Sequence, residues 1–253
     1  MSAIAKATIR RHVAPRVADL EACSPVSCKD CGIYSLCREV NGPKVDLRLL
    51  ETIVRNRKIF KRGEIIYRVG EPLRAIYAIR SGTIKSYVLT KDGRMQITGF
   101  QINGEVLGLG AMATNQHMNE ARALETTMVC EVPVDLLEGY SAEVPSIRQQ
   151  MLKIMSQEIL DNQELMLLLG KKNADERLAT FLLSLSRRFQ RRSYSPTQFN
   201  LSMSRSDIGN YLGMAEETEC RVFTRFQEDG LLATERRQVQ LLDQERLQFI
   251  ARI

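Results

Sequence analysis

The spacing of apolar residues divides most of the chain into a region of short strands and two helical regions. From about residue 58 to residue 134, apolar and polar positions alternate over short runs such as Ile76-Tyr-Ala-Ile-Arg and Ile84-Lys-Ser-Tyr-Val-Leu, with glycines between the runs. This alternation is typical of antiparallel strands, and Lys91-Asp-Gly-Arg is typical of a hairpin turn. Several short strands with regular turn signals predict a small barrel or roll.

A long helical region follows, from about Pro145 to Lys172. Its apolar positions recur at alternating spacings of three and four residues, the pattern of a two-stranded coiled coil. One helix packed on its own roll would carry the same stripe. Asn162 favours a dimer, because across a two-fold interface the amide meets its twin, sets the register and keeps association weak. The predicted dimer seam comprises Leu152, Met155, Ile159, Asn162, Met166 and Leu169.

The last part of the chain has the pattern of a helix-turn-helix. Ser204 is placed as an N-cap with Asp207 three residues later, and Gly213 permits a tight turn. Val222 and Phe226 then bring a second helix back to the core, and residues 230–242 predict a terminal wing hairpin. A helix-turn-helix usually places its second helix in the DNA major groove, so DNA is a predicted partner.

Composition and charge are consistent with a DNA-binding protein and give little support to an enzyme. The 253 residues are 44% hydrophobic and carry a formal charge of +6, with the basic excess in residues 1–60 and 171–200. Two histidines and no tryptophan leave little for an imidazole-based catalytic centre. The sequence contains no apolar block long enough to predict an export signal or a membrane span, so we expect a cytoplasmic protein.

Four cysteines lie close together near the amino terminus: Cys23, Cys28, Cys31 and Cys37. In a reducing cytoplasm such clusters are more often metal ligands or redox sensors than disulfides. Thiolates bind soft metal ions and iron-sulfur clusters, and the Cys28-x2-Cys31 spacing is found with both. Structural zinc, which typically takes two close cysteine pairs, is the alternative.

Three stretches resemble the FNR branch of oxygen-responsive regulators in the CRP/FNR family. They are Tyr77-Ala-Ile-Arg-Ser-Gly-Thr-Ile-Lys-Ser-Tyr, Lys171-Lys-Asn-Ala-Asp-Glu-Arg-Leu-Ala and Asp207-Ile-Gly-Asn-Tyr-Leu-Gly. The resemblance implies an α+β fold with an amino-terminal cyclic-nucleotide-binding-like β-roll, a long dimerisation helix and a carboxyl-terminal winged helix-turn-helix. The expected division is a mobile arm over 1–22, a cluster-binding loop and sensory roll over 23–144, the dimerisation helix over 145–172 and the DNA-binding domain over 173–253.

The same resemblance implies a cofactor and a function. It implies a 4Fe-4S cluster held by Cys28, Cys31, Cys37 and Cys130, with Cys23 outside the ligand set. The spacing of the first three cysteines with one distant partner favours iron and sulfide over zinc. The implied function is an oxygen-responsive transcription regulator that binds a palindromic TTGAT-type site as a homodimer while its cluster is intact. It is expected to lose dimerisation and DNA binding in oxygen. RNA polymerase is an implied partner.

For DNA reading the resemblance implies a Glu, a Ser and an Arg in the second helix. Glu217 and Arg221 match, and Cys220 replaces the serine, which predicts looser preference at one base. Glu219 stands where the motif supplies Ile or Val, so it should cost stability unless it reaches solvent or is paired. We expect phosphate contacts from the basic residues Arg187, Arg188, Arg205 and Arg225.

The roll is predicted to bind no cyclic nucleotide. Relatives that bind cyclic AMP use a Glu after a glycine and an Arg-Ser pair at the phosphate. Gly104-Glu105 is retained, but Glu120-Ala121 stands where the Arg-Ser pair is expected. A carboxylate at this position would repel a phosphate.

Two other functions remain as alternatives. An iron-sulfur electron-transfer or redox protein would share the cysteines, but the chain lacks a second cofactor motif and this function leaves the helix-turn-helix without a role. A regulator of the same fold that senses nitric oxide or a metal would share every feature above. Spectra and size measurements on anaerobically isolated protein distinguish between them.

Overall fold

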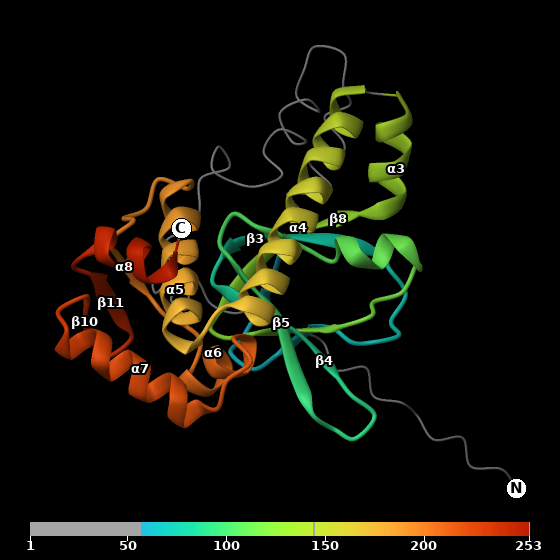
Figure 1. Cartoon of the computed structure of the whole chain (residues 1–253). Coiled ribbons are helices and arrows are strands. Elements are labelled where there is room, and N and C mark those ends of the chain that lie inside the picture. The colour runs from blue at the N-terminus through green and yellow to red at the C-terminus, as the bar shows by residue number, and fades with distance from the viewer. Residues whose placement is uncertain (1–56, 144, 253) are drawn as a thin grey trace, which may run out of the picture.

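The computed structural model describes residues 57–143 and 145–252. The predicted arm, together with Cys23, Cys28, Cys31 and Cys37, lies outside the described residues. Figure 1 shows a β-roll, a long helix that crosses it, and a smaller helical domain with a sheet beside the roll. The α+β fold predicted from the sequence is confirmed.

The roll consists of two four-stranded antiparallel sheets, with strand orders β1-β8-β3-β6 and β2-β7-β4-β5. Alternating side chains fill the space between them, as the period-two pattern predicts. The strands are β1 (Arg57–Phe60), β2 (Ile65–Tyr67), β3 (Ala75–Ser81), β4 (Thr83–Leu89), β5 (Met95–Ile102), β6 (Val106–Leu107), β7 (Glu120–Ala123) and β8 (Thr127–Pro133).

Glycines form the tight turns on either side of β4. Gly93 has φ 82° in the hairpin between β4 and β5, which confirms the predicted turn. Gly82, with φ 93°, joins β3 to β4, and a Cβ atom there would collide with Thr127. Both positions therefore favour glycine on backbone conformation, and the second also on space.

Three helical segments lie against the roll: the 3-10 helix η3 (Leu109–Ala113), α3 (Val134–Glu143) and α4 (Pro145–Lys171). Helix α3 was not predicted. A buried cluster holds the start of α4 on the roll and contains Ile76, Ala78, Leu109, Cys130, Val132, Val134, Leu137, Ile147 and Met151. The rest of α4 extends over the roll toward the second domain (Figure 1).

The second domain is a winged helix-turn-helix whose three-stranded sheet has the order β10-β11-β9. The predicted wing hairpin is confirmed but is not terminal, because α8 follows it and packs on α5. Strand β9 and helix α8 were not predicted. The elements are α5 (Ala174–Gln190), β9 (Gln198–Asn200), α6 (Arg205–Tyr211), α7 (Glu216–Glu228), β10 (Leu232–Glu235), β11 (Gln238–Leu241) and α8 (Gln244–Ala251).

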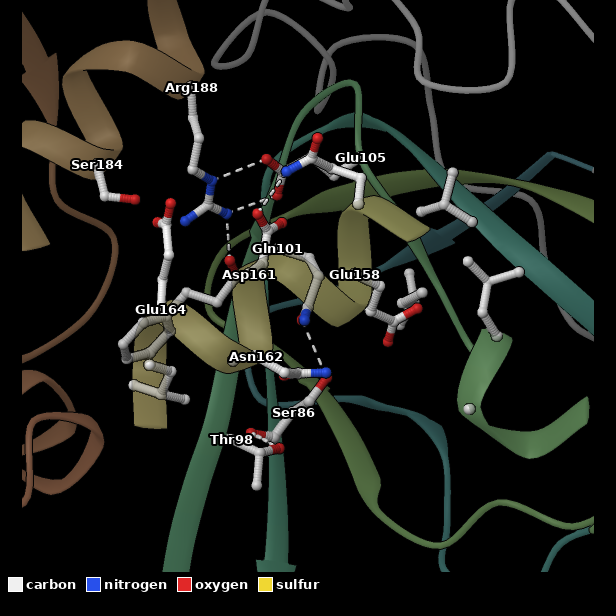
Figure 2. A pocket seen from close by; sticks show the side chains of 18 of the residues that line it. Ser86, Thr98, Gln101, Glu105, Glu158, Asp161, Asn162, Glu164, Ser184 and Arg188 are labelled. Atoms are coloured by element: carbon white, nitrogen blue, oxygen red, sulfur yellow. Dashed lines mark hydrogen bonds and ion pairs between the residues drawn. The ribbon is translucent and has the colours of Figure 1, made fainter. Parts of the chain in front are cut away.

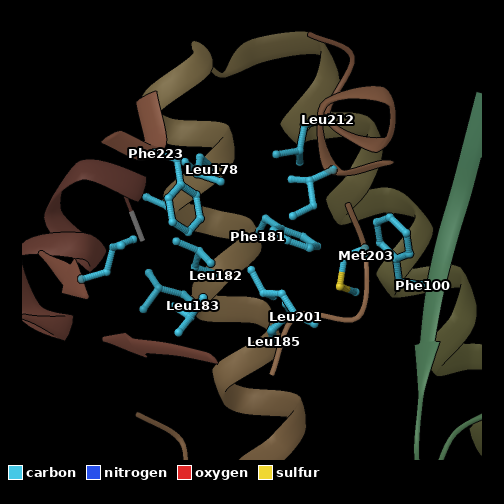
Figure 3. Close-up of a cluster of buried hydrophobic side chains, with 14 of the residues drawn as sticks. Phe100, Leu178, Phe181, Leu182, Leu183, Leu185, Leu201, Met203, Leu212 and Phe223 are labelled. Atoms are coloured by element: carbon cyan, nitrogen blue, oxygen red, sulfur yellow. The ribbon is translucent and has the colours of Figure 1, made fainter. Parts of the chain in front are cut away.

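The largest buried cluster joins this domain to the roll. It runs from the buried face of α5 through Met203 to Phe100 on β5 (Figure 3). The ring of Phe100 lies 6.0 Å from that of Phe181 and 5.1 Å from that of Tyr211, measured between ring centroids. The second domain, called the reading domain below, and the roll therefore share one apolar core in this structure.

Candidate functional site

The two helices of the helix-turn-helix are fixed by local contacts. Ser204 Oγ accepts a hydrogen bond from the Asp207 N–H at 3.0 Å, and Asp207 Oδ2 accepts one from the Ser204 N–H at 3.2 Å. This reciprocal capping box begins α6, as the sequence predicted. Gly213, with φ 62°, forms the turn, and the buried residues Val222 and Phe226 return α7 to the core.

The predicted reading residues lie together on an exposed face of α7. Glu217, Cys220 and Arg221 are exposed and line a shallow surface pocket, together with Thr224, Arg225 and Glu228. Their spacing of three and four residues places them on one face of the helix. Desolvation and the adjacent Glu219 carboxylate raise the pKa of the Cys220 thiol, so it stays protonated near neutral pH. Whether Cys220 relaxes base preference stays a prediction.

Glu219 is paired rather than extended to solvent. Its side chain is 0% exposed, and Arg205 Nη1 donates to its Oε1 at 3.3 Å. The Arg205 guanidinium carbon also lies 3.2 Å from the ring centroid of Phe223, one turn further along α7. Burial raises the pKa of Glu219, and the Arg205 charge offsets only part of that effect. Of the two arrangements that the sequence left open, the structure has the pair.

Other predicted phosphate contacts have partners inside the protein. Arg225 forms an ion pair with Asp175 on α5. Arg188 points to the roll, where its Nε donates to Glu105 Oε1 at 2.8 Å and its Nη2 to Glu105 Oε2 at 2.5 Å (Figure 2). The prediction that Arg188 contacts phosphate is therefore wrong for this structure, because its charge already neutralises a partly buried carboxylate. Arg187 is exposed.

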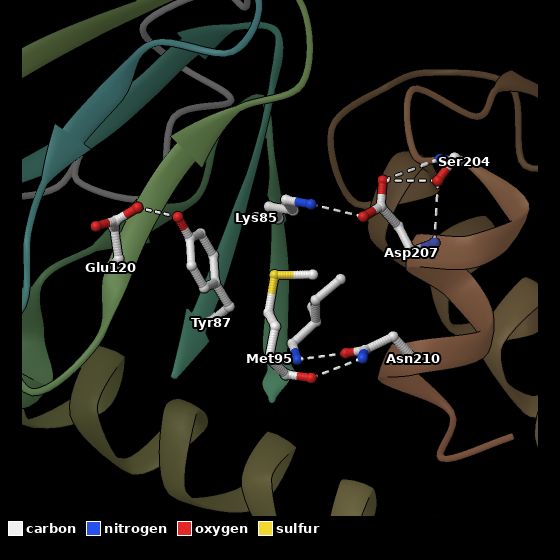
Figure 4. Close-up of polar contacts among 8 residues, drawn as sticks. Lys85, Tyr87, Met95, Glu120, Ser204, Asp207 and Asn210 are labelled. Carbon is white, nitrogen blue, oxygen red and sulfur yellow. Dashed lines mark hydrogen bonds and ion pairs between the residues drawn. The ribbon is translucent and has the colours of Figure 1, made fainter. Parts of the chain in front are cut away.

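Polar contacts also dock α6 on the β4–β5 hairpin, far away in sequence (Figure 4). Lys85 Nζ lies 2.6 Å from Asp207 Oδ1. Asn210 accepts from the Ile97 N–H at 2.6 Å and donates to the Met95 carbonyl at 2.8 Å. Burial alone would raise the pKa of Asp207, but the hydrogen bond and charge of Lys85 outweigh it and hold that pKa below its usual value. Sequence reasoning missed this contact.

Two residues at the positions that the resemblance links to nucleotide binding, Glu105 and Glu120, have hydrogen-bond partners within the chain. Glu105 binds Arg188 as described, and Arg192 Nη2 lies 3.1 Å from Glu105 Oε1. Glu120 accepts hydrogen bonds from the Tyr87 hydroxyl and, at 3.1 Å, from Arg122 Nη2. A cavity of about 650 Å³ lies between the roll, α4 and α5 (Figure 2). The absence of cyclic-nucleotide binding stays a prediction.

Helix α4 presents part of the predicted seam to solvent. Leu152, Ile159 and Met166 are 59%, 58% and 73% exposed. Met155 and Leu169 are half-buried, while Asn162 is exposed and also borders the cavity (Figure 2). These three large apolar side chains are not buried against the roll. Their exposure favours a helix that packs against a second copy over one that packs only on its own roll.

Comparisons with known proteins identify the chain's relatives. A model of the cyclic nucleotide-binding domain matches residues 57–143 and one of the Crp-like helix-turn-helix domain matches residues 176–250. The transcriptional activator protein Anr of Pseudomonas protegens is 47% identical over 224 residues, which are 88% of this chain and 92% of Anr. The fumarate and nitrate reduction regulatory protein of Escherichia coli is 44% identical over 226 residues, 89% of this chain and 90% of that protein. The chain belongs to the FNR branch of the CRP/FNR family.

A solved structure of this wider family has the same architecture. FixK2 from Bradyrhizobium japonicum superimposes with a TM-score of 0.72 at 33% identity, covering 77% of this chain and 96% of FixK2. The FNR-type chain is thus a transcription regulator with a Crp-like DNA-binding domain and not an enzyme. None of the helices within the described ranges is long and apolar enough to cross a membrane.

Of the cluster ligands implied for an FNR-type protein, the structure describes Cys130. It lies in β8, 7% exposed, opposite Arg57 of β1 on one side and Ala78 of β3 on the other. Cys28, Cys31 and Cys37 lie outside the described residues, so their grouping with Cys130 stays a prediction. Over residues 57–143 and 145–252, no three His, Cys, Asp or Glu side chains are grouped as a metal site.

Proposed function

We propose that the chain is an oxygen-responsive transcription activator that binds a palindromic TTGAT-type site as a homodimer when it carries a 4Fe-4S cluster, and that it loses dimerisation and DNA binding in oxygen. Relatives named for transcriptional activation and for fumarate and nitrate reduction support this proposal. RNA polymerase is the partner that an activator of this kind recruits.

The surroundings of Cys130 fit a cluster ligand supplied by the roll. Its thiol lies at the border of an apolar cluster, an environment that suits a soft ligand and limits access of water. Arg57, the first described residue after the amino-terminal cysteines, is its neighbour in β1. Nineteen residues lie between Cys37 and Arg57, and a chain of that length can span tens of ångströms, so Cys37 can reach the neighbourhood of Cys130.

One observation carries the proposed coupling: Cys130 shares its buried cluster with Ile147 and Met151, in the first two turns of α4. A 4Fe-4S cluster supplies reactivity with oxygen when it is bound. Because Cys130 and the start of α4 belong to one buried cluster, a change in how Cys130 is held is expected to shift the packing of that helix. The exposed stripe of α4 then favours or disfavours association with a second copy.

The dimer gives the reading helices a spacing that can be tested. Two copies related by a two-fold axis along α4 present two α7 helices, which read half-sites about one helical turn, or roughly 34 Å, apart. In this proposal Arg221 binds guanine O6 and N7, and Glu217 accepts from cytosine N4. A palindromic site follows from this symmetry.

Serine at position 130 tests the proposal. Anaerobically isolated Cys130→Ser is expected to lose the visible absorption of the cluster, elute as a monomer and bind a TTGAT duplex at least tenfold more weakly than the parent. The matched control is Cys220→Ser, which changes an exposed thiol of α7 and should keep the spectrum and the mass. Air should convert the parent to the behaviour of Cys130→Ser.

Two outcomes would contradict the proposal. The first is a parent protein that keeps its spectrum, mass and DNA affinity in air. The second is a Cys130→Ser protein that keeps the cluster. A response to nitric oxide in place of oxygen would favour the same-fold alternative, and spectral change without any change in DNA affinity would favour an electron-transfer protein.

A further inference from the structure

The residue that departs most from expectation in the reading helix is Glu219, a carboxylate with no exposed surface. Its Oε1 lies 3.3 Å from Arg205 Nη1, and its Oε2, also buried, has no N–H or O–H donor within the described part of the chain. The neighbouring Cys220 thiol also hydrogen-bonds this carboxylate, but a thiol is a weak donor, so burial of the carboxylate still costs stability. Its presence here therefore needs a reason other than packing.

Arg205 lies in the helix of the helix-turn-helix that usually crosses the DNA backbone. It is the first residue of α6 after the Ser204 cap, and the first helix of this motif crosses the phosphates. In this structure its guanidinium lies instead against α7, between Glu219 and the ring of Phe223. Glu219 and Phe223 are four residues apart on one face of α7, so both side chains contact the Arg205 guanidinium.

The charge of Arg205 is not fully available to DNA in this arrangement. Within the ion pair the net charge is zero, and a phosphate that approaches Arg205 also approaches the Glu219 carboxylate. The first turn of α7 already contains Glu216 and Glu217, so the local field at the phosphates is unfavourable before Glu219 is added. Phosphate and Glu219 compete for one guanidinium.

We propose that Glu219 is a positioning residue that holds Arg205 on the reading helix and withholds it from the DNA backbone, lowering affinity for every sequence and leaving discrimination to Glu217 and Arg221. Phosphate contacts carry no sequence information, whereas base contacts do. When contacts to the DNA phosphates contribute little binding free energy, the protein depends more on its contacts to the correct bases. Glu219 thus sets the overall strength of DNA binding, while the ratio of specific to non-specific binding is left to Glu217 and Arg221.

The test is a pair of substitutions that remove the carboxylate, Glu219→Gln and Glu219→Ile, measured in the full-length anaerobic protein. Both are expected to bind a TTGAT duplex and a random duplex more tightly, by on the order of tenfold at low salt, because an arginine is released to phosphate. The slope of log affinity against log salt should steepen by about 0.9 per subunit. Denaturant unfolding checks that both variants are folded.

Arg205→Gln completes the cycle. In the parent it should change the salt slope little, while in the Glu219→Gln background it should reverse the gain in affinity and slope. Glu216→Gln, an exposed glutamate in the same turn, is the matched control, and its effect should be the same with and without Arg205.

Three results would overturn the inference. Unchanged affinity and slope in both Glu219 variants would show that Arg205 is not withheld. Weaker binding would show that Glu219 presents Arg205 to phosphate. A gain that survives Arg205→Gln would show that the carboxylate acts through general repulsion. Each result is read from DNA affinity alone, so it is distinguishable from failure of the oxygen response.

Discussion

Glu105 shows how one residue of a nucleotide-type roll can take a new role. Its carboxylate, 17% exposed, lies between Arg188 of α5 and Arg192, which follows that helix. Its Oε2 also accepts from the Ile102 N–H at 3.0 Å. Burial alone would raise the pKa of Glu105, but the charge and hydrogen bonds of Arg188, then the charge of Arg192, outweigh it and hold that pKa below its usual value. Glu105 therefore acts as a bridge between the roll and the reading domain.

Replacing this carboxylate should loosen the bridge. Glu105→Gln is expected to lower the free energy of unfolding by about 2 to 4 kcal/mol, since two partly buried guanidinium groups lose their counter-ion. Denaturant unfolding measures the loss. Asp92→Asn, in the exposed hairpin turn, is the control and should leave the transition midpoint unchanged.

The same pair gives a pH dependence with a definite sign. The pKa of Glu105 is lower in the folded than in the unfolded chain, so its stabilisation is fully present above the unfolded carboxyl value of about 4 and is lost as the pH falls through the folded value. Asp207 acts in the same direction. Acid should therefore lower the free energy of unfolding of the parent more than that of Glu105→Gln. If the free energies of unfolding of the two proteins fell in parallel with pH, Glu105 would not be the group responsible.

At the scale of elements, the sequence was enough to predict helices and turns whose ends are set by residues close together in the chain. Ser204 and Asp207 begin α6 and Gly213 ends the turn, all within ten residues, so the pattern was sufficient. Strand β9 has three residues and exists because β11 pairs with it, which no local pattern encodes. The Glu105–Arg188 pair joins residues 83 positions apart, and for Glu219 the sequence indicated a problem without naming Arg205 as its partner.

Helix α4 carries a prediction of its own at this scale. Asn162→Leu should strengthen the seam, because a polar residue at a seam position lowers coiled-coil stability in exchange for register. We expect the dissociation constant to fall about tenfold or more, so that a fraction of the protein remains dimeric in air. Gel filtration before and after air measures it.

The control for this helix is Asn200→Leu, which makes the same change at an exposed position of β9. It should leave the mass of the protein unchanged under both conditions. If Asn162→Leu dissociated in air as completely as the parent, Asn162 would not limit association, and its position at the border of the cavity would be the reason for its presence.

Across the whole molecule, the contacts between roll and reading domain form a continuous series. Thr83 Oγ1 and Ser202 Oγ both donate to Glu125 Oε1, at 2.9 and 2.7 Å. The Lys85–Asp207 ion pair, the hydrogen bonds of Asn210, the Glu105 bridge and the Phe100 rings extend that series along β4 and β5. We therefore expect a change in the roll to reach α6 through these contacts.

Asn210 can be substituted to interrupt these contacts, because its side chain hydrogen-bonds the backbone of β5. Asn210→Ala removes hydrogen bonds to the Ile97 N–H and the Met95 carbonyl, together about 1 to 3 kcal/mol of docking free energy. Since coupling between two sites cannot exceed the free energy of the contacts that transmit it, the ratio of DNA affinities without and with air should shrink about fivefold or more. Fluorescence anisotropy of a labelled TTGAT duplex measures both affinities.

Asn200→Ala is the matched control for this experiment, because Asn200 is an exposed asparagine of the same domain that lies on β9 and not on the docked helix. It should keep the parent ratio. Amide hydrogen exchange separates loss of docking from loss of folding: in Asn210→Ala the amides of β5 and α6 should exchange faster, while those of the buried helix α5 keep their protection. An unchanged affinity ratio together with faster exchange at the hairpin would mean that the response to air reaches DNA through α4 alone, with the docked hairpin serving only to hold the domains together.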